Sequence, residues 1–251
     1  MTITGRLAVD PPPAGDRVGW TNVYLCRTVG GTRSRLVGSP DRGGRFEFVA
    51  PPGDYELWCY GTYLADTRSP LAIPPGVAAV DAGTITGKPT RWGAVVGQPN
   101  PGLPGVVRWV GTPTPPDALT GKVVLLYFAN AGGGDPKLWK WEAVTALHDK
   151  YAAKGLAVVG VYGDATGESL NAAAGMLELL ALPFPVALAS GIADDWGMNV
   201  TAPGRTKLAA AYGAEPYPHG VLIDRRGMVR DRWRPDHPPS TATLEKLLAE
   251  K

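Results

Sequence analysis

Residues 119–131 have the sequence LTGKVVLLYFANA, and their central part, Val123–Ala129, is apolar without interruption. Such a run is typical of a strand that is buried on both faces within a sheet. A second apolar run, Ala157–Tyr162, predicts another buried strand. Between the two runs, apolar residues recur at helical spacing: Leu138, Trp141, Val144, Leu147 and Tyr151. The segment therefore predicts a β-α-β unit with parallel strands.

The ends of the intervening helix carry start and stop signals. Asp135 is a residue type that caps helix N-termini, and Pro136 suits the first helical position. Gly155 is a typical residue just beyond a helix C-terminus. We therefore expect one helix that begins at Pro136 and ends before Gly155.

The same alternation of strands and helices continues to the C-terminus. Helices are predicted at 167–180, 205–212 and 240–250, and strands at 184–189, 219–224 and 228–233. The last two strands flank a short turn that contains Gly227, which predicts an antiparallel hairpin. The predicted order is β-α-β-α-β-α-β-β-α, a mixed sheet flanked by helices.

The first 88 residues have a different character. Short alternating runs are separated by Gly, Pro and Asp, which predicts an all-β sandwich. The predicted strands are Ile3–Val9, Asn22–Thr28, Arg35–Gly38, Arg45–Val49, Tyr55–Gly61 and Ala79–Ile85.

Residues 89–117 are rich in proline and show little periodicity, so we expect a linker there. The predicted organisation is thus a sandwich domain at 1–88, a linker at 89–117 and an α/β domain at 118–251. The chain holds 33 Gly and 25 Pro, but 44% of its 251 residues are hydrophobic, which is too much apolar mass for a disordered protein.

Charge and composition exclude several functions. The net charge of +2 gives no polyanion-binding signature, and the arginines of 225–234 are interpreted as edge-strand charges, so no nucleic-acid partner is expected. The sequence contains no run of about 18 apolar residues, so no transmembrane helix is expected. The N-terminus lacks the features of a signal peptide, which favours a cytoplasmic protein unless a leader or anchor was removed. With 2 Cys and 3 His, no metal and no other cofactor is expected.

Residues 39–61, SPDRGGRFEFVAPPGDYELWCYG, resemble the carboxypeptidase regulatory-like domain, a small transthyretin-like sandwich. The resemblance is carried by an Asp and Gly turn, the F-x-F strand of Phe46 and Phe48, and the P-P-G-x-Y-x-L pattern that ends at Leu57. Gly44 allows a tight hairpin, and Pro-Pro-Gly redirects the chain into the next strand. The resemblance implies a structural adaptor without chemistry of its own.

Residues 118–250 resemble the thioredoxin-like fold of the TlpA-type thiol–disulfide oxidoreductases and the alkyl hydroperoxide reductase group. The resemblance is carried by residues 119–131, by KYAAKGLAVVGVYGD at 150–164 and by AAAYGAEPYPHGVLIDRRGMV at 209–229. In these families, redox cysteines occupy the turn between the first core strand and its helix, where a helix N-terminus stabilises a thiolate. Here that turn contains no cysteine, and none follows Cys59. The resemblance therefore implies the fold and not the redox activity.

The resemblance also indicates where a binding site would remain. The vestigial turn comprises Gly132, Gly133, Gly134, Asp135 and Pro136. Pro218 matches the cis-proline of the family, so a cis Tyr217–Pro218 bond is expected, with His219 at the rim of a peptide-binding groove. Because the turn offers no nucleophile and no phosphate-binding motif, no catalytic residue is assigned.

The two cysteines lie in the predicted sandwich. In Asn22–Arg27 the core-facing positions leave Cys26 pointing outward, whereas Cys59 shares the core-facing side of its strand. Opposite faces argue against a disulfide, and a buried Cys59 would act as a small hydrophobic residue.

Three functions stay open on this evidence. The first is a non-catalytic binding or scaffold module with a protein or peptide partner, which the lack of redox cysteines in the thioredoxin-like region favours. The resemblance also implies an exported bacterial protein, because such domain pairings belong mostly to that class. The second is a thiol–disulfide oxidoreductase or peroxiredoxin-like protein that uses Cys26 or Cys59. The third is a glycan or peptide binder that uses exposed aromatic residues of the sandwich, namely Trp20, Trp58, Tyr60 and Tyr63. The sequence does not specify the ligand or the oligomeric state.

Overall fold

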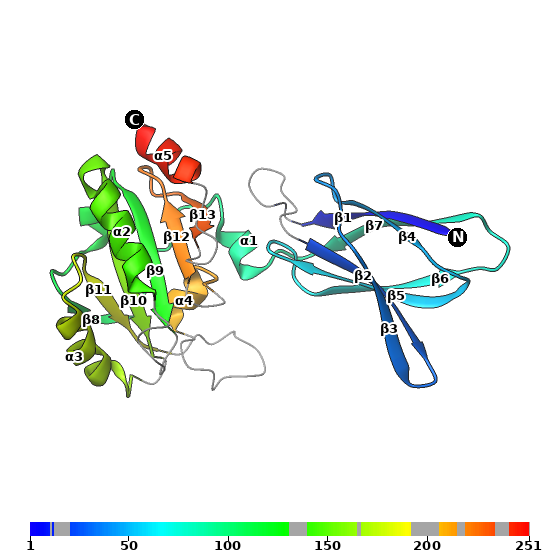
Figure 1. Ribbon diagram of the computed structural model, residues 1–251, viewed down its shortest axis with the longest axis horizontal. Helices are drawn as coiled ribbons and strands as arrows, with labels where there is room; N and C mark the ends of the chain where they lie inside the picture. The colour runs from blue at the N-terminus through cyan, green and yellow to red at the C-terminus, as the bar shows by residue number, and fades with distance from the viewer. Residues whose placement is uncertain are drawn as a thin grey trace. The chain divides into compact units, whose positions relative to one another are not determined.

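The computed structural model describes residues 1–10, 12, 21–130, 140–164, 167–191, 206–214, 219–233 and 241–250. The chain divides into two compact units, Met1–Ala94 (unit 1) and Val95–Lys251 (unit 2) (Figure 1). Unit 1 consists of strands, and unit 2 combines strands with helices. A short helix, α1 (Arg91–Val95), lies at the boundary.

The strands of unit 1 form two sheets. They are β1 (Thr2–Val9), β2 (Thr21–Val29), β3 (Thr32–Gly38), β4 (Arg45–Val49), β5 (Gly53–Gly61), β6 (Thr67–Ile73) and β7 (Ala79–Gly87). One sheet has the order β4-β1-β7 and the other the order β3-β2-β5-β6. All neighbours are antiparallel except β1 and β7, which are parallel.

One hydrophobic core joins the two sheets of unit 1. Ile3 and Leu7 of β1 belong to the same cluster as Val23 and Leu25 of β2. The predicted pair Phe46 and Phe48 of β4 is buried in this cluster as well, with ring centroids 5.9 Å apart. Alternation along each strand therefore places apolar side chains on the faces that share the core.

Gly44 lies directly before β4, at a position that only glycine suits. Its φ is +80°, in the left-handed region. A Cβ atom at this position would lie 2.5 Å from the carbonyl oxygen of Leu7. The turn that the sequence predicted around Gly44 thus needs both the backbone freedom and the small size of glycine.

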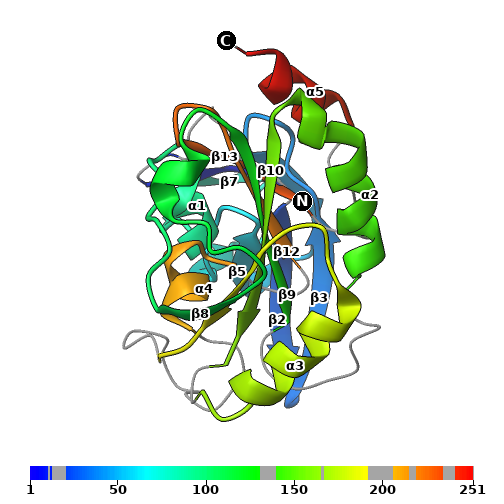
Figure 2. The ribbon, with the colours of Figure 1, turned by 90° about the vertical axis from the view of Figure 1, so that its left-hand side faces the viewer.

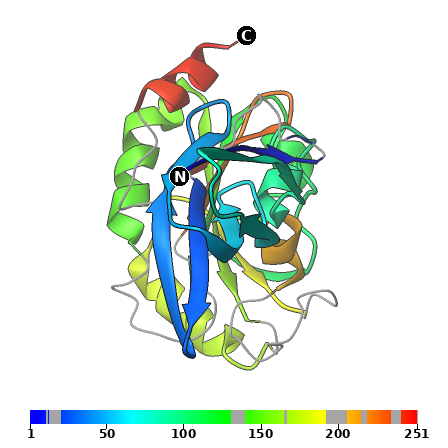
Figure 3. The same ribbon diagram turned by 90° about the vertical axis from the view of Figure 1, so that its right-hand side faces the viewer.

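The structure extends the predicted strands and adds one. β6 was not predicted, because Pro70 interrupts an already polar pattern; as an edge strand, β6 tolerates the missing N–H. β3 begins at Thr32, three residues before the predicted strand, because it pairs with β2 as far as the Gly30-Gly31 turn. Figure 3 shows β2 and β3 as a long two-stranded ribbon at the edge of their sheet.

Unit 2 contains a six-stranded mixed sheet with the order β13-β12-β9-β10-β11-β8. Its strands are β8 (Val106–Val110), β9 (Val123–Asn130), β10 (Leu156–Gly163), β11 (Val186–Ala189), β12 (His219–Ile223) and β13 (Val229–Trp233). Its helices are η1 (Pro116–Leu119), α2 (Trp141–Tyr151), η3 (Ala152–Lys154), α3 (Leu170–Leu180), α4 (Lys207–Ala211) and α5 (Thr241–Ala249).

The strands β9, β10 and β11 are parallel, and β8, β12 and β13 complete the sheet through antiparallel pairs. Helices cover both faces (Figure 2). On one face α2, α3 and α5 share a core with Leu125 and Tyr127 of β9. On the other face Tyr212, which follows α4, lies against Phe128, with ring centroids 5.9 Å apart. Residues 123–250 thus follow the predicted order β-α-β-α-β-α-β-β-α.

Two predictions for this region were wrong. The helix that carries Trp141 does not run on from Pro136, because Lys140 has a left-handed conformation (φ 55°, ψ 33°) and α2 begins at Trp141. Asp135 therefore does not cap α2. Residues 89–117 are also not a simple linker, since they include α1 and the edge strand β8. β8 was missed because prolines surround a run of only five residues.

Candidate functional site

The sequence predicts a peptide-binding site from the residues that follow β9 and from those that precede β12. β9 ends at Asn130, and β12 begins at His219. The two strands are antiparallel, and their register pairs His219 with Phe128. The end of β9 and the beginning of β12 therefore lie at the same end of the sheet. Most of the predicted site lies in them, outside the described residues: Gly132, Gly133, Gly134, Asp135, Pro136, Tyr217 and Pro218.

His219 is the one predicted site residue that the structure describes, and it is not at a rim. Its side chain is fully buried. All five residues of β12 are buried, because this strand lies between β9 and β13 and is covered on both faces. A completely buried imidazole is not exposed to a peptide in a groove. The prediction for His219 is therefore corrected to a core position.

A cavity of about 280 Å³ lies at the opposite end of β9, near its first residues. Its lining includes Val124 and Leu126 of β9, Ile223 of β12, and the turn after β12. Asp224 is in that turn, but its carboxylate accepts hydrogen bonds from the backbone N–H of Arg226 and Met228, both at 2.9 Å. The lining thus combines apolar side chains with polar ones, and the Asp224 carboxylate among them is already used to close the turn.

The polar side chains on the opposite wall of the cavity are also engaged. Asn100 donates to the carbonyl of Gly227 at 2.9 Å, and Tyr212 donates to the carbonyl of Gly102 at 3.0 Å. Burial raises the pKa of Tyr212, so its hydroxyl stays protonated. Asp224, Asn100 and Tyr212 therefore act as structural groups in the wall of this cavity.

Both cysteines are free and buried. Cys59 faces the core of unit 1 as predicted, with no exposed surface, and Cys26 is only 3% exposed although it points away from that core. Aromatic and arginine side chains cover the outer face of the sheet around Cys26. One of them is Arg33, whose pKa is raised first of all by its hydrogen bond with the Cys26 thiol.

Cross-strand pairs of β2 and β5 lie on the same outer face of the sheet as Cys26. Tyr24 lies directly opposite Trp58, and their rings stack with centroids 5.1 Å apart. The hydroxyls of Tyr24 and Tyr60 are hydrogen bonded at 3.0 Å. This bond is the main reason that the pKa of Tyr24 is raised. The three rings form one aromatic cluster on the outer face of the sheet.

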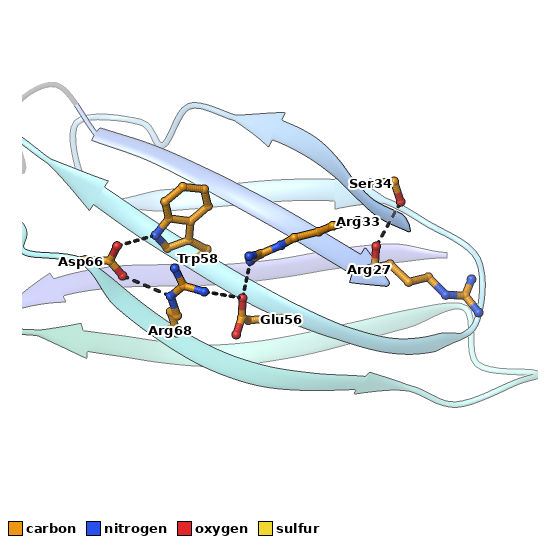
Figure 4. Close-up of polar contacts among 7 residues, drawn as sticks. All are labelled: Arg27, Arg33, Ser34, Glu56, Trp58, Asp66 and Arg68. Atoms are coloured by element: carbon orange, nitrogen blue, oxygen red, sulfur yellow. Dashed lines mark hydrogen bonds and ion pairs between the residues drawn. The ribbon is translucent and has the colours of Figure 1, made fainter. Parts of the chain in front are cut away.

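Charged side chains enclose the Trp58 ring (Figure 4). The guanidinium groups of Arg33 and Arg68 lie 5.6 and 5.2 Å from its centroid. Both arginines pair with Glu56, and the indole N–H donates to Asp66 at 2.9 Å. These contacts argue against the hypothesis that the Trp58 ring is a free surface for stacking on a ligand, because the ring already has partners. The alternating arginines of TRSRLVG at 32–38 were the sequence signal for this network.

The described residues include no group of three or more His, Cys, Asp or Glu side chains that could hold a metal ion. Among the helices of the described part, none has the length and hydropathy needed to cross a bilayer. Trp20 of the aromatic hypothesis lies outside the described residues, and Tyr63 is half-buried.

No family model matches the sequence, and no curated protein is similar to it. Solved structures are similar. A thioredoxin-like superfamily protein is 20% identical over 61% of this chain and 97% of its own, with a TM-score of 0.46. DsbE, a thiol:disulfide interchange protein from Chlorobium tepidum, is 24% identical over 61% and 98%, with a TM-score of 0.41. A thiol-disulfide isomerase from Corynebacterium glutamicum is 18% identical over 61% and 98%, with a TM-score of 0.46.

Unit 2 has a thioredoxin-like fold, as the order and direction of its strands show. The β9-α2-β10 crossover gives two parallel strands, β12 pairs antiparallel with β9, and β13 returns as a hairpin. The central order is therefore β10-β9-β12-β13, followed by the last helix, α5. This is the arrangement that the sequence resemblance implied.

Proposed function

We propose that this protein is a non-catalytic binding or scaffold module that lacks thiol–disulfide oxidoreductase activity. The observation that carries the proposal is the position of its thiols. Both cysteines are in unit 1, and both are buried. The thioredoxin-like unit contains no cysteine at all.

The chemistry of Cys59 supports this proposal. Burial, and to a lesser extent the charge of Asp66, raises the pKa of Cys59 to about 12. Catalytic thiols of redox proteins have pKa values below the ordinary value of about 8.5. At neutral pH the thiolate fraction of Cys59 is therefore on the order of one in 10⁵. A buried and protonated thiol cannot attack a disulfide or a peroxide.

The alternative, an oxidoreductase of the type that the fold suggests, is tested directly. The full chain is assayed for reduction of insulin by dithiothreitol and for consumption of hydrogen peroxide. Our proposal expects no turnover above the uncatalysed rate. The positive control is a variant with Gly133→Cys and Pro136→Cys, which restores the C-x-x-C spacing in the turn. Turnover by the wild type that Cys26→Ser or Cys59→Ser abolishes would overturn the proposal.

We further propose that the peptide-binding site of unit 2 is formed by Gly132–Pro136 and Tyr217–Pro218. Support comes from the register of β9 and β12, in which the last residues of β9 lie beside the first residue of β12, at one end of the sheet. A peptide-display library screened against the full chain and against a Gly133→Trp variant tests this site. The proposal expects captured peptides that the variant no longer binds, and equal capture by both proteins would overturn it.

For unit 1, we propose a regulatory-like sandwich with an adaptor role. The two sheets that share one core support this proposal, as does the glycine at the β4 turn. Glycan binding through Trp58 has less support, because the indole ring already has two guanidinium groups and a carboxylate as partners.

A further inference from the structure

The edge strand β3 differs from the other sheet edges of unit 1. β6 carries Pro70, β4 has only five residues, and β7 has a register shift near Gly83, whose φ is +68°. Proline, short length, irregularity and charged side chains are the usual features that keep an edge strand from pairing with another chain. β3 has only the last of them, in Arg33 and Arg35, and it pairs with β2 in an unbroken register of seven residues.

β3 is also the most exposed strand of the unit. Every residue from Thr32 to Val37 is exposed. Among them are two large apolar side chains, Leu36 at 46% and Val37 at 61% exposure. They point to opposite faces, because they are consecutive in a strand. An added strand could therefore bury apolar surface on both faces.

The charges of β3 select what can pair with it. Arg33 and Arg35 lie on the same face as Val37. Arg33 is already paired with Glu56 (Figure 4). Within the described part of the chain, no carboxylate pairs with Arg35, and its guanidinium lies 5.3 Å from the centroid of the Tyr24 ring. The middle of β3 thus offers one cation that no acidic group compensates.

We propose that β3 binds an extended segment of a partner protein by strand addition. The segment has an acidic residue opposite Arg35 and apolar residues opposite Leu36 and Val37. Backbone hydrogen bonds along the free edge supply affinity, and these side-chain pairs supply specificity. The inference goes beyond the function proposed above, because it concerns unit 1 and requires nothing of the thioredoxin-like unit.

A second copy of the same chain fits this edge less well. Antiparallel pairing of two β3 strands about Ser34 brings Arg33 of each copy opposite Arg35 of the other. Like charges directly opposite each other destabilise a strand pair. An acidic segment removes this repulsion and adds a favourable cross-strand pair instead, so charge complementarity favours a different protein as the partner.

Fluorescence anisotropy with two labelled probe peptides tests the proposal on the full chain. The acidic probe VVEVEVT places glutamates on one face of an extended strand, and the basic probe VVKVKVT differs only in charge. We expect the acidic probe to bind roughly tenfold more tightly at low salt. A version of the acidic probe with alternate backbone amides N-methylated should not bind, because it cannot extend the sheet.

Variants locate the site. Arg35→Glu should weaken binding of the acidic probe and make the basic probe the preferred one. Arg42→Glu is the matched control: it makes the same charge change at an exposed turn residue outside β3 and should leave both affinities unchanged. Val37→Pro blocks the edge without a change in charge, because the register directs the N–H of Val37 away from β2. Near-UV circular dichroism of the aromatic cluster verifies that each variant is folded.

Three outcomes would overturn the proposal. The first is no binding of either probe at millimolar concentration. The second is an equal loss of affinity in Arg35→Glu and Arg42→Glu, which would indicate unspecific attraction. The third is a dimer in sedimentation that Val37→Pro dissociates, which would make a second copy the occupant. None of these results depends on redox activity, so they leave the proposed function untouched.

Discussion

Cys26 and Cys59 lie on neighbouring strands but on opposite faces of one sheet. The register places Cys26 opposite Glu56 and Cys59 opposite Val23. Val23 and Cys59 belong to the core of unit 1, whereas Cys26 lies on the outer face, which also carries the aromatic cluster. A direct disulfide between them would require one strand to turn over. The two thiols therefore serve as small packing groups on the two sides of the sheet.

The first prediction concerns pH. The pKa of Cys59 is about 12 in the folded chain, and a thiol in an unfolded chain titrates near 8.5. Between these values the unfolded state loses the proton while the folded state retains it. The contribution of the protonated thiol is therefore complete below pH 8.5 and is lost as the pH rises towards 12. We expect the free energy of unfolding to fall over this range.

Urea unfolding at a series of pH values measures this effect. Cys59→Ala is less stable than the wild type at pH 7, because a buried group is removed. The difference between the two proteins should shrink above pH 9, since only the wild type loses the contribution of the thiol. Parallel pH profiles for the two proteins would contradict the raised pKa.

The second prediction tests which face of α3 covers the sheet of unit 2. Leu177 is 1% exposed and belongs to the core, whereas Leu179 is 88% exposed. Leu177→Ala should cost about 2–5 kcal/mol in the free energy of unfolding. Leu179→Ala, the same change two residues away, should cost less than about 0.5 kcal/mol. Denaturant unfolding followed by circular dichroism compares them, and similar costs would mean that α3 is rotated.

The third prediction separates two roles of a glycine. Gly44 and Gly76 both have a φ close to +80°, but only Gly44 has a neighbour in the way of a Cβ atom. Gly76→Ala should cost about 1–2 kcal/mol, which is the left-handed strain alone. Gly44→Ala should cost a further 1–3 kcal/mol, roughly, because the clash is with backbone that must shift. Equal thermal shifts for the two variants would refute the close approach of Leu7.

The sequence predicts the elements of this protein well where the signal is local. Continuous apolar runs identified β9 and β10, and alternation identified β1, β2, β4 and β5. Edge strands gave weaker signals, because they need no apolar face and tolerate proline. β6 with Pro70 and β8 among its prolines were missed for that reason. The break before α2 was missed because lysine is not a residue type that predicts a left-handed backbone, yet Lys140 adopts one.

The candidate site was harder to predict than the fold. Alternation gave the correct face for Cys26 but carried no information on its burial, which is almost complete. His219 was expected at a rim, since sequence order shows that it follows a turn. It does not show that β12 lies between two other strands. In both cases non-local packing, which no local pattern encodes, decided the environment of the residue.

The last prediction asks what holds the outer face of the β3-β2-β5-β6 sheet together. Glu56 pairs with Arg33 and Arg68, but all three side chains are 39–46% exposed. Ion pairs at this level of exposure contribute little, so Glu56→Gln should change the free energy of unfolding by less than about 1 kcal/mol. Tyr24 is only 7% exposed and stacks on Trp58 at 5.1 Å. Tyr24→Ala should therefore cost about 3 kcal/mol.

Urea unfolding at low and high salt distinguishes these contributions. If the aromatic rings hold the face, Tyr24→Ala is destabilised to the same extent at both salt concentrations, and Glu56→Gln stays close to the wild type. A larger cost for Glu56→Gln than for Tyr24→Ala would show instead that the ion pairs hold the face. In that case the arginines of β3 would be structural supports. If the aromatic rings hold the face, Arg35 can pair with an acidic partner without loss of stability, because the packing of this face then depends on the rings and not on the arginines.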